Sequence, residues 1–154
     1  MFDISGDIIA PEMGMPVVKD FEFIEHTADV GIVAYGVDMQ EAFVNAARGM
    51  FSLIVEAESV RGITHHDIEV TAPDEESLLV TWLNELIYLF DVENILFSRF
   101  DITELDTNRL KARAYGEPVD NTRHKLKTGI KAATSHMVEV DRSEGGRVRV
   151  LFDI

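Results

Sequence analysis

The sequence predicts a single α+β domain in which two helices pack on one face of a mixed, mostly antiparallel sheet. Three observations support this prediction. Two segments have apolar residues at helical spacing, and the remaining segments alternate between apolar and polar residues. The chain of 154 residues, 46% hydrophobic and 27% charged, is also long enough to bury one core.

The domain is expected to cover residues 21–154. Residues 1–20 contain glycine and proline without an apolar period, which predicts a loosely ordered N-terminal extension. The pattern becomes strand-like at Phe21 and remains so through Tyr35.

The first helix is expected after Asp38. Asp38 is placed as an N-cap, and Glu41 follows three residues later, as in a capping box. Gly49 lies within the helix and disfavours it by about 1 kcal/mol relative to alanine. The apolar residues that keep helical spacing are Ala42, Phe43, Ala46, Ala47, Met50, Phe51 and Ile54.

A short strand over residues 66–71 precedes the second helix, which opens at residues 73–76 with acidic residues in its first turn. The apolar residues of this helix occupy more than a narrow stripe, which predicts burial on two sides. They are Leu78, Leu79, Trp82, Leu83, Leu86, Ile87, Leu89 and Phe90. Asn84 and Glu85 are polar exceptions, and the pattern leaves open whether they approach a site or bond to the sheet.

After Asn94 the chain is predicted to be extended to its last residue. Adjacent side chains of a strand point to opposite faces, and the even-numbered positions are expected to face inward. These are Leu110, Ala112, Ala114, Val138, Val140, Val148, Val150 and Phe152. Basic residues alternate with them, and Arg123, Lys125 and Lys127 continue the outward basic set if their segment is extended. Residues 143–146 predict a hairpin turn.

Composition narrows the possible functions. The absence of cysteine excludes disulfides, thiolate metal sites and cysteine nucleophiles. No apolar run approaches the roughly 20 residues needed to span a bilayer, so a cytoplasmic protein without a membrane partner is expected. The net charge of −14 disfavours non-specific binding to nucleic acid and favours a basic protein partner. Two solvated faces without a partner are an equally good explanation of the charge.

Candidate ligands lie at both ends of the domain. His26, Thr27 and Asp29 stand between apolar residues, where polar groups either cap the backbone or build a site. Asp153 lies one residue before the carboxylate of Ile154. With Asp29, these groups would supply three anionic oxygens of the kind that calcium or magnesium requires. Sequence alone does not bring them together, and solvated carboxylates are the alternative.

Two rival classes of function use other features. A metal-dependent hydrolase would use the same carboxylates, but it needs a positioned base, and no ordered triad or paired-metal motif appears in the sequence. A nucleic-acid-binding module would use Arg109, Lys111, Arg113, Arg123, Lys125 and Lys127. The overall charge disfavours strong binding by this set.

Several separated motifs resemble the archease family. In chain order they are Glu-His-Thr-Ala-Asp-Val-Gly at residues 25–31, Trp-Leu-Asn-Glu-Leu at 82–86, Arg-His-Lys-Leu-Lys-Thr at 123–128, Lys-Ala-Ala-Thr at 131–134 and Phe-Asp-Ile at 152–154. The resemblance covers about residues 21–154, and motifs that occur in order are more specific than one short match.

The resemblance implies a non-catalytic protein cofactor of the tRNA-splicing ligase. Such a protein promotes guanylylation of the ligase's active-site histidine and allows multiple turnover, and nucleic acid is involved only indirectly. The resemblance also implies a divalent-metal site, with calcium first and magnesium or manganese as alternatives. Its ligands are Asp29, Asp153 and the main-chain oxygens of Ile154. A chaperone or modulator of proteins that process RNA or DNA is the second interpretation.

The remaining motif residues have supporting roles in this interpretation. His26 and Thr27 would orient Asp29 through hydrogen bonds, although a histidine that caps backbone at a strand end is an equal alternative. His124, Lys125 and Lys127 would contact the ligase or a phosphate. A basic strand edge that resists aggregation is the simpler account of this segment.

Overall fold

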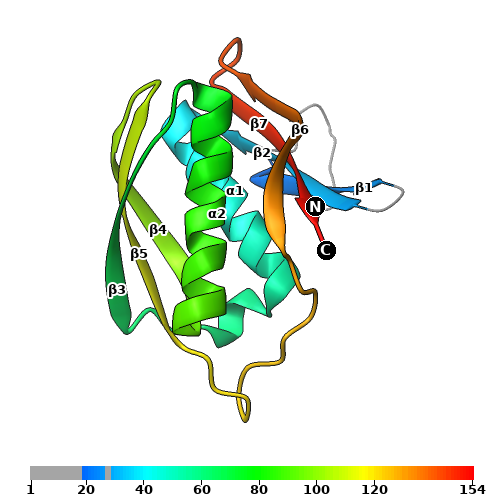
Figure 1. Ribbon diagram of the computed structural model, residues 1–154, viewed down its shortest axis with the longest axis vertical. Coiled ribbons are helices and arrows are strands. Elements are labelled where there is room, and N and C mark those ends of the chain that lie inside the picture. Colours follow the sequence, from blue (N-terminus) through cyan, green and yellow to red (C-terminus); the bar gives the residue numbers. More distant parts are fainter. Residues whose placement is uncertain (1–18, 27–28) are drawn as a thin grey trace, which may run out of the picture.

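The computed structural model describes residues 19–26 and 29–154, which form two antiparallel sheets with two long helices between them (Figure 1). The first sheet has the strand order β1-β2-β7-β6, formed by Phe21–His26, Asp29–Gly36, Gly146–Asp153 and Ala132–Asp141. The second has the order β3-β5-β4, formed by Thr64–Thr71, Arg109–Pro118 and Ile95–Leu105. The predicted N-terminal extension lies almost entirely outside the described residues.

Helix α1 spans Met39–Ile54 and begins as predicted. The Asp38 carboxylate accepts a hydrogen bond from the Glu41 amide at 2.9 Å, and the Glu41 carboxylate accepts one from the Val37 amide at 2.8 Å. The structure also explains Gly49. A Cβ atom at this position would lie 3.1 Å from the ring of Phe21, so the glycine lets β1 pack closely on the helix.

Helix α2 spans Glu75–Glu93. Its N-cap Asp74 accepts a hydrogen bond from the Ser77 amide at 2.8 Å. The Trp82 indole is fully buried and donates to the carbonyl oxygen of Phe43 at 3.1 Å, which ties the two helices together. The predicted burial on two sides is confirmed, since α2 packs on β6 of the first sheet and on β3 of the second. Of the described helices, none is both long and apolar enough to cross a membrane.

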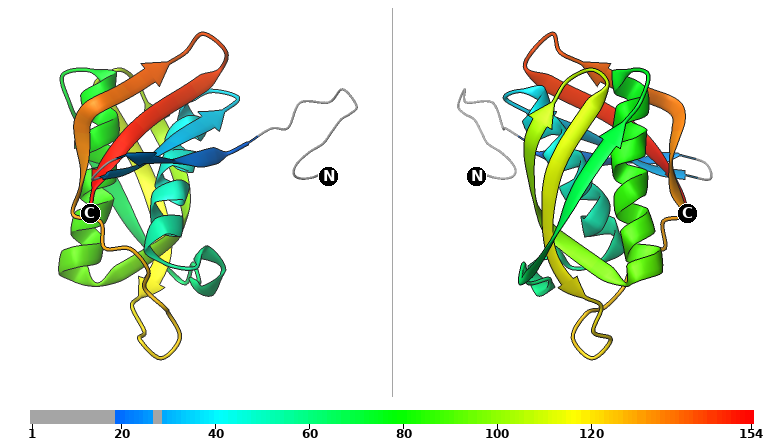
Figure 2. Two further views of the ribbon diagram at one scale, coloured as in Figure 1. Left: turned by 90° about the vertical axis from the view of Figure 1, so that its right-hand side faces the viewer. Right: turned by 60° about the vertical axis from the view of Figure 1, so that its left-hand side comes forward.

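The α+β class with two helices is confirmed, but the strands form two sheets and not the single sheet that was expected. The helices therefore lie between two sheets, and α1 packs on β2 and β7 on one side and on β4 on the other (Figures 1 and 2). Apolar alternation specifies which side chains face the core. It does not specify which strands pair, so one sheet and two sheets have the same pattern.

Residues 119–131 form a loop, which corrects the prediction that the chain is extended throughout after Asn94. Arg123, Lys125 and Lys127 therefore do not continue the basic row of β5. The loop attaches to the C-terminal end of α1 through an isolated bridge between Val55 and Leu126. Two further backbone hydrogen bonds hold it there, Lys127 N to Ile54 O at 2.7 Å and Thr128 N to Leu53 O at 3.1 Å.

Two hairpins complete the first sheet. The strand-like segment that begins at Phe21 is a hairpin of β1 and β2, because its residues pair antiparallel with each other. The predicted hairpin of β6 and β7 is confirmed, and Gly145 in its turn has a positive φ of 86°, a conformation that favours glycine.

Candidate functional site

Asp29 and Asp153 lie directly opposite each other at one end of the first sheet. Asp29 is the first residue of β2, Asp153 is the last residue of β7, and the antiparallel register pairs them. The same row continues to His26 in β1 and to Ala132 in β6. Figures 1 and 2 show the C-terminus of the chain beside the start of β2. The fold therefore brings together two acidic residues from opposite ends of the domain.

Strand alternation directs both carboxylates away from the core. Their neighbours Val30 and Phe152 face inward, and Phe152 is fully buried. Asp153 is exposed and Asp29 is partly exposed. Because directly opposed residues of an antiparallel pair project from the same face, the two carboxylates share the outer face of the sheet.

Residues opposed in an antiparallel register have a spacing that suits one shared cation. Opposed Cβ atoms lie about 4.5–5.5 Å apart. Two oxygens bound to one calcium ion lie about 5 Å apart or less, because each calcium–oxygen distance is about 2.3–2.6 Å. The two side chains do not complete a coordination shell, and the described residues contain no group of three or more His, Cys, Asp or Glu placed to hold a metal. Further oxygens would have to come from main chain, as predicted for Ile154, or from water.

Gly31 lies two residues after Asp29, on the same face of β2. A Cβ atom at this position would lie 2.5 Å from Cδ2 of Leu151 and 2.8 Å from the carbonyl oxygen of Val150. Leu151 is buried although it lies on the outer face of the sheet. The glycine at the end of the motif in residues 25–31 is therefore explained by the close approach of Leu151.

Two hydrogen-bonded contacts secure the segment of β6 that flanks Asp153. The Lys131 amide donates to the carbonyl oxygen of Asp153 at 2.8 Å. The Asn84 side chain of α2 donates to the carbonyl oxygen of Ala133 at 3.1 Å and accepts from its amide at 2.8 Å. Of the two alternatives for Asn84, the structure shows bonding to the sheet, one residue away from the row of Asp29 and Asp153.

The other predicted site residues are placed differently. Thr27 lies outside the described residues, and for His26 only the backbone is described. Lys125 is exposed on the loop of residues 119–131, and Lys127 on the same loop lies 3.7 Å from the carboxylate of Glu56. His124 is only 4% exposed, and both of its ring nitrogens are hydrogen-bonded within the protein, so its side chain is not presented to a partner.

Glu117 is the buried acidic residue around which this loop is organised. It is only 3% exposed and accepts hydrogen bonds from the Arg123 guanidinium, the Arg61 amide and the His124 ring. The hydrogen bond from Arg123, followed by those from Arg61 and His124, lowers the pKa of Glu117 to about 2, against the opposing effect of burial. Sequence reasoning missed this residue, because it is the penultimate residue of β5 and belongs to no distinctive motif.

Most of the basic residues assigned to a nucleic-acid interface are paired with acids of the same chain. Arg109 donates to Glu69 at 2.9 Å, and Arg113 donates to Asp67 at 2.8 Å. Arg123 and Lys127 are paired with Glu117 and Glu56. The structure therefore neutralises much of the basic row that the sequence shows, which disfavours nucleic-acid binding at this surface.

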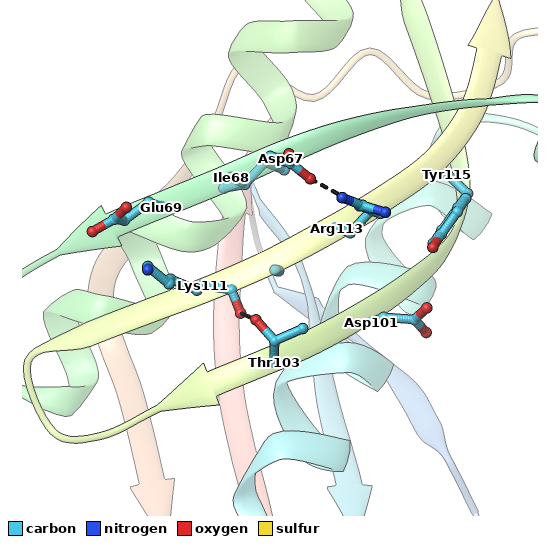
Figure 3. Close-up of a pocket in the computed structure, with 9 residues that line it drawn as sticks. Asp67, Ile68, Glu69, Asp101, Thr103, Lys111, Arg113 and Tyr115 are labelled. Atoms are coloured by element: carbon cyan, nitrogen blue, oxygen red, sulfur yellow. Dashed lines mark hydrogen bonds and ion pairs between the residues drawn. The ribbon is translucent and has the colours of Figure 1, made fainter.

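A cavity of about 520 Å³ lies on the outer face of the second sheet (Figure 3). Its three carboxylates are each bound by an arginine, and these pairs are Asp67 with Arg113, Glu69 with Arg109 and Asp101 with Arg99. The hydrogen bond from Arg113 lowers the pKa of Asp67. Because these carboxylates are occupied, the cavity offers little to a cation or to a general base. Sequence reasoning missed it, because the pairing of β3 with β5 is a tertiary feature.

These observations define a class of small α+β protein whose candidate site is a carboxylate pair on the outer face of a sheet. The sequence profile of the archease protein family (MTH1598/TM1083) matches residues 21–154. The chain belongs to the archease family.

Relatives and known structures agree with this assignment. The protein archease of Methanosarcina mazei is 41% identical over 141 residues, which cover 88% of this chain and 97% of the relative. The protein archease of Saccharolobus islandicus is 41% identical over 132 residues, which cover 85% and 95%. The solution structure of protein 1598 of Methanobacterium thermoautotrophicum has a TM-score of 0.77 and 38% identity, covering 89% of this chain and all of that one.

The fold also resembles that of a more distant archease. The crystal structure of an archease from Thermotoga maritima, described as a possible chaperone, has a TM-score of 0.58 and 22% identity. The match covers 94% of this chain and 99% of that chain.

Proposed function

We propose that this protein is a non-catalytic activator of a tRNA-splicing RNA ligase. It promotes guanylylation of the active-site histidine of the ligase and so allows multiple turnover. It does this with a divalent cation held by Asp29, Asp153 and the main-chain oxygens of Ile154. The observation that carries the proposal is the direct opposition of Asp29 and Asp153 on the outer face of the first sheet. Membership of the archease family supports the choice of partner.

The electrostatics of the pair favour a cation. Like charges placed directly opposite each other on neighbouring strands are destabilising. Asp153 is exposed at the end of β7, so a cation can reach its carboxylate. Carboxylate and main-chain oxygens are the ligands of hard cations, so calcium is the first candidate and magnesium and manganese are the alternatives.

The position of the pair suits a role in a complex. Bound metal supplies positive charge that neutralises phosphate oxygens in nucleotidyl transfer. Asp29 and Asp153 belong to two paired strands, which fix the separation of their side chains. Because Asp153 is exposed and Asp29 is partly exposed, a partner can approach them, and the net charge of −14 favours a basic partner.

A ligation assay with RNA in excess over ligase tests the proposal. The wild-type protein should convert single turnover into multiple turnover. Asp29→Asn and Asp153→Asn should abolish this effect without lowering the urea midpoint, and both should lose calcium binding in calorimetric titration. Asp67→Asn is the matched control, since it removes one negative charge on the other sheet and should leave activation intact.

Each part of the proposal has its own contrary result. If Asp29→Asn and Asp153→Asn activate normally, the metal site is not used. If the wild-type protein does not increase turnover at all, it is not a ligase activator. Cleavage of RNA by the protein alone with magnesium would favour a hydrolase. Protection of the ligase from aggregation by the wild type and both variants alike would favour a chaperone.

A further inference from the structure

Asn84 makes a two-way contact between α2 and the edge of the first sheet. Its side-chain amide donates to the carbonyl oxygen of Ala133 and accepts from the amide of the same residue, at 3.1 and 2.8 Å. A neighbouring strand would satisfy these two backbone groups in the same way. Among residues 19–26 and 29–154, β6 is an edge strand with no strand on this side, and Asn84 occupies that place.

The backbone pairing of this part of β6 with β7 is short, while Ala133 also packs in the core and β6 packs on α2. Residues 132–134 pair with β7 over three positions, and the register then shifts until Glu139. Within the irregular stretch, Met137 has a positive φ of 59°, a conformation that is uncommon for residues other than glycine. The loop of residues 119–131 precedes the strand. The short ladder is therefore isolated on both sides, and the Asn84 contact lies at its middle residue.

The same three-residue ladder holds Asp153. Ala132 is the register partner of Asp153, and Ala133 is the partner of the buried Phe152. The Lys131 amide adds a hydrogen bond to the carbonyl oxygen of Asp153 at 2.8 Å. Asp153 is thus held between β2, which carries Asp29, and a segment of β6 that depends on Asn84 for its outer hydrogen bonds.

We propose that Asn84 is a positioning residue for the candidate metal site. Its amide fixes the start of β6, which keeps the end of β7 in the sheet with Asp153 opposite Asp29. The proposal deepens the proposed function and rests on it in one respect, since it takes Asp153 to be a ligand. It gives Asn84, one of the two polar residues in the Trp-Leu-Asn-Glu-Leu motif, a role that a core helix by itself does not need.

Two substitutions and one matched control test this role in the full chain. Asn84→Ala removes both hydrogen bonds. Asn84→Asp keeps the acceptor for the Ala133 amide but places a carboxylate against the Ala133 carbonyl oxygen. Asn45→Ala is the control, because Asn45 is a buried helix residue whose amide donates to the carbonyl oxygen of Tyr35 at 2.7 Å. Tyr35 lies toward the other end of β2 from Asp29.

Calcium titration and amide hydrogen exchange provide the readouts. Asn84→Ala and Asn84→Asp should weaken calcium binding about tenfold or more, as is usual when a residue that supports a ligand is lost. Both should also speed exchange of the Lys131 amide. Asn45→Ala should lower the urea midpoint about as much as Asn84→Ala does. Its calcium affinity should remain within about twofold of the wild-type value, and exchange of the Lys131 amide should be unchanged.

Two results would overturn the positioning role. One is an equal loss of calcium affinity in the Asn84 and Asn45 variants, which would indicate general destabilisation. The other is unchanged exchange at Lys131 in both Asn84 variants. If wild-type protein binds neither calcium, magnesium nor manganese, the metal part of the proposed function fails, and exchange at Lys131 still decides whether Asn84 holds the end of the sheet.

Discussion

The imidazole of His124 is held between Glu117 and the backbone of Asp120. Its Nδ1 accepts a hydrogen bond from the Asp120 amide at 2.9 Å, and its Nε2 lies 2.9 Å from the Glu117 carboxylate. Because Nδ1 is an acceptor, the ring proton is on Nε2 and is donated to Glu117. The contact between His124 and Glu117 fastens the loop of residues 119–131 to the end of β5, so His124 has a structural role.

The buried carboxylate of Glu117 should make stability depend on acid pH. Its pKa is lowered from 4.5 to about 2 in the folded protein, so its contribution is complete above pH 4.5 and is lost as the pH falls from 4.5 towards 2. Glu117→Gln should lower the free energy of unfolding by about 3 kcal/mol at pH 7, because it leaves Arg123 without its partner. In urea titrations, the difference from wild type should shrink at pH 3.

Glu56→Gln is the control for this measurement, since the Glu56 side chain is 66% exposed and its ion pair with Lys127 contributes little. A difference between wild type and Glu117→Gln that stays constant from pH 7 to pH 3 would contradict the role assigned to the Glu117 charge.

Replacement of His124 tests whether this residue has a structural role or contacts the ligase. His124→Ala should lower the free energy of unfolding by about 2 kcal/mol, because Glu117 and the Asp120 amide lose a partner in a buried place. Ligation measured at a temperature where the variant is folded should still show full activation. A variant with wild-type stability and no activation would instead assign His124 to the ligase interface.

Gly31→Ala should destabilise the junction of β2 and β7. The added Cβ would meet Leu151 at 2.5 Å and the Val150 carbonyl oxygen at 2.8 Å, so an increase of about 2 kcal/mol in the free energy of the folded state is expected. Gly129→Ala is the matched control, since a Cβ there has no neighbour within 4 Å. Thermal unfolding should show a lower midpoint for Gly31→Ala alone.

A double substitution tests the reason for this effect. In the double variant Gly31→Ala with Leu151→Ala, the shorter side chain at residue 151 removes the closest contact. The loss of unfolding free energy in the double variant should therefore be smaller than the sum of the losses in the two single variants. Full additivity would show that the Leu151 side chain is not the cause.

Extension of the chain tests whether the carboxylate of Ile154 is a metal ligand. In protein expressed with the printed sequence, Ile154 carries a carboxylate, and two glycines added after it convert that group to a neutral amide. Calcium affinity should fall about tenfold, since affinity depends on the number of charged ligands. Ile154→Val keeps the carboxylate and should bind calcium as the wild type does. Equal affinity of the extended and unextended proteins would exclude the carboxylate as a ligand.

The helices show what local patterns predict well. The cap Asp38, the acidic residues that open the second helix, and the apolar spacing behind them specify α1 and α2, because a helix is built from contacts within four residues. Strand alternation likewise predicts the buried residues of β5 and β7. The loop of residues 119–131 was missed, because its basic residues alternate as in a strand while their partners, Glu117 and Glu56, are supplied by other segments.

The sequence by itself determined the α+β class, the two helices, the inward-facing residues of β5 and β7, and the identity of Asp29, Asp153 and Ile154 as candidate oxygen ligands. Only the tertiary structure decided that the strands divide into two sheets, that Asp29 is the register partner of Asp153, and that Asn84 bonds to β6 beside them. The physical reason is that propensity and periodicity act over a few residues. The pairing of β2 with β7 joins the two ends of the domain, and it depends on how the whole core packs.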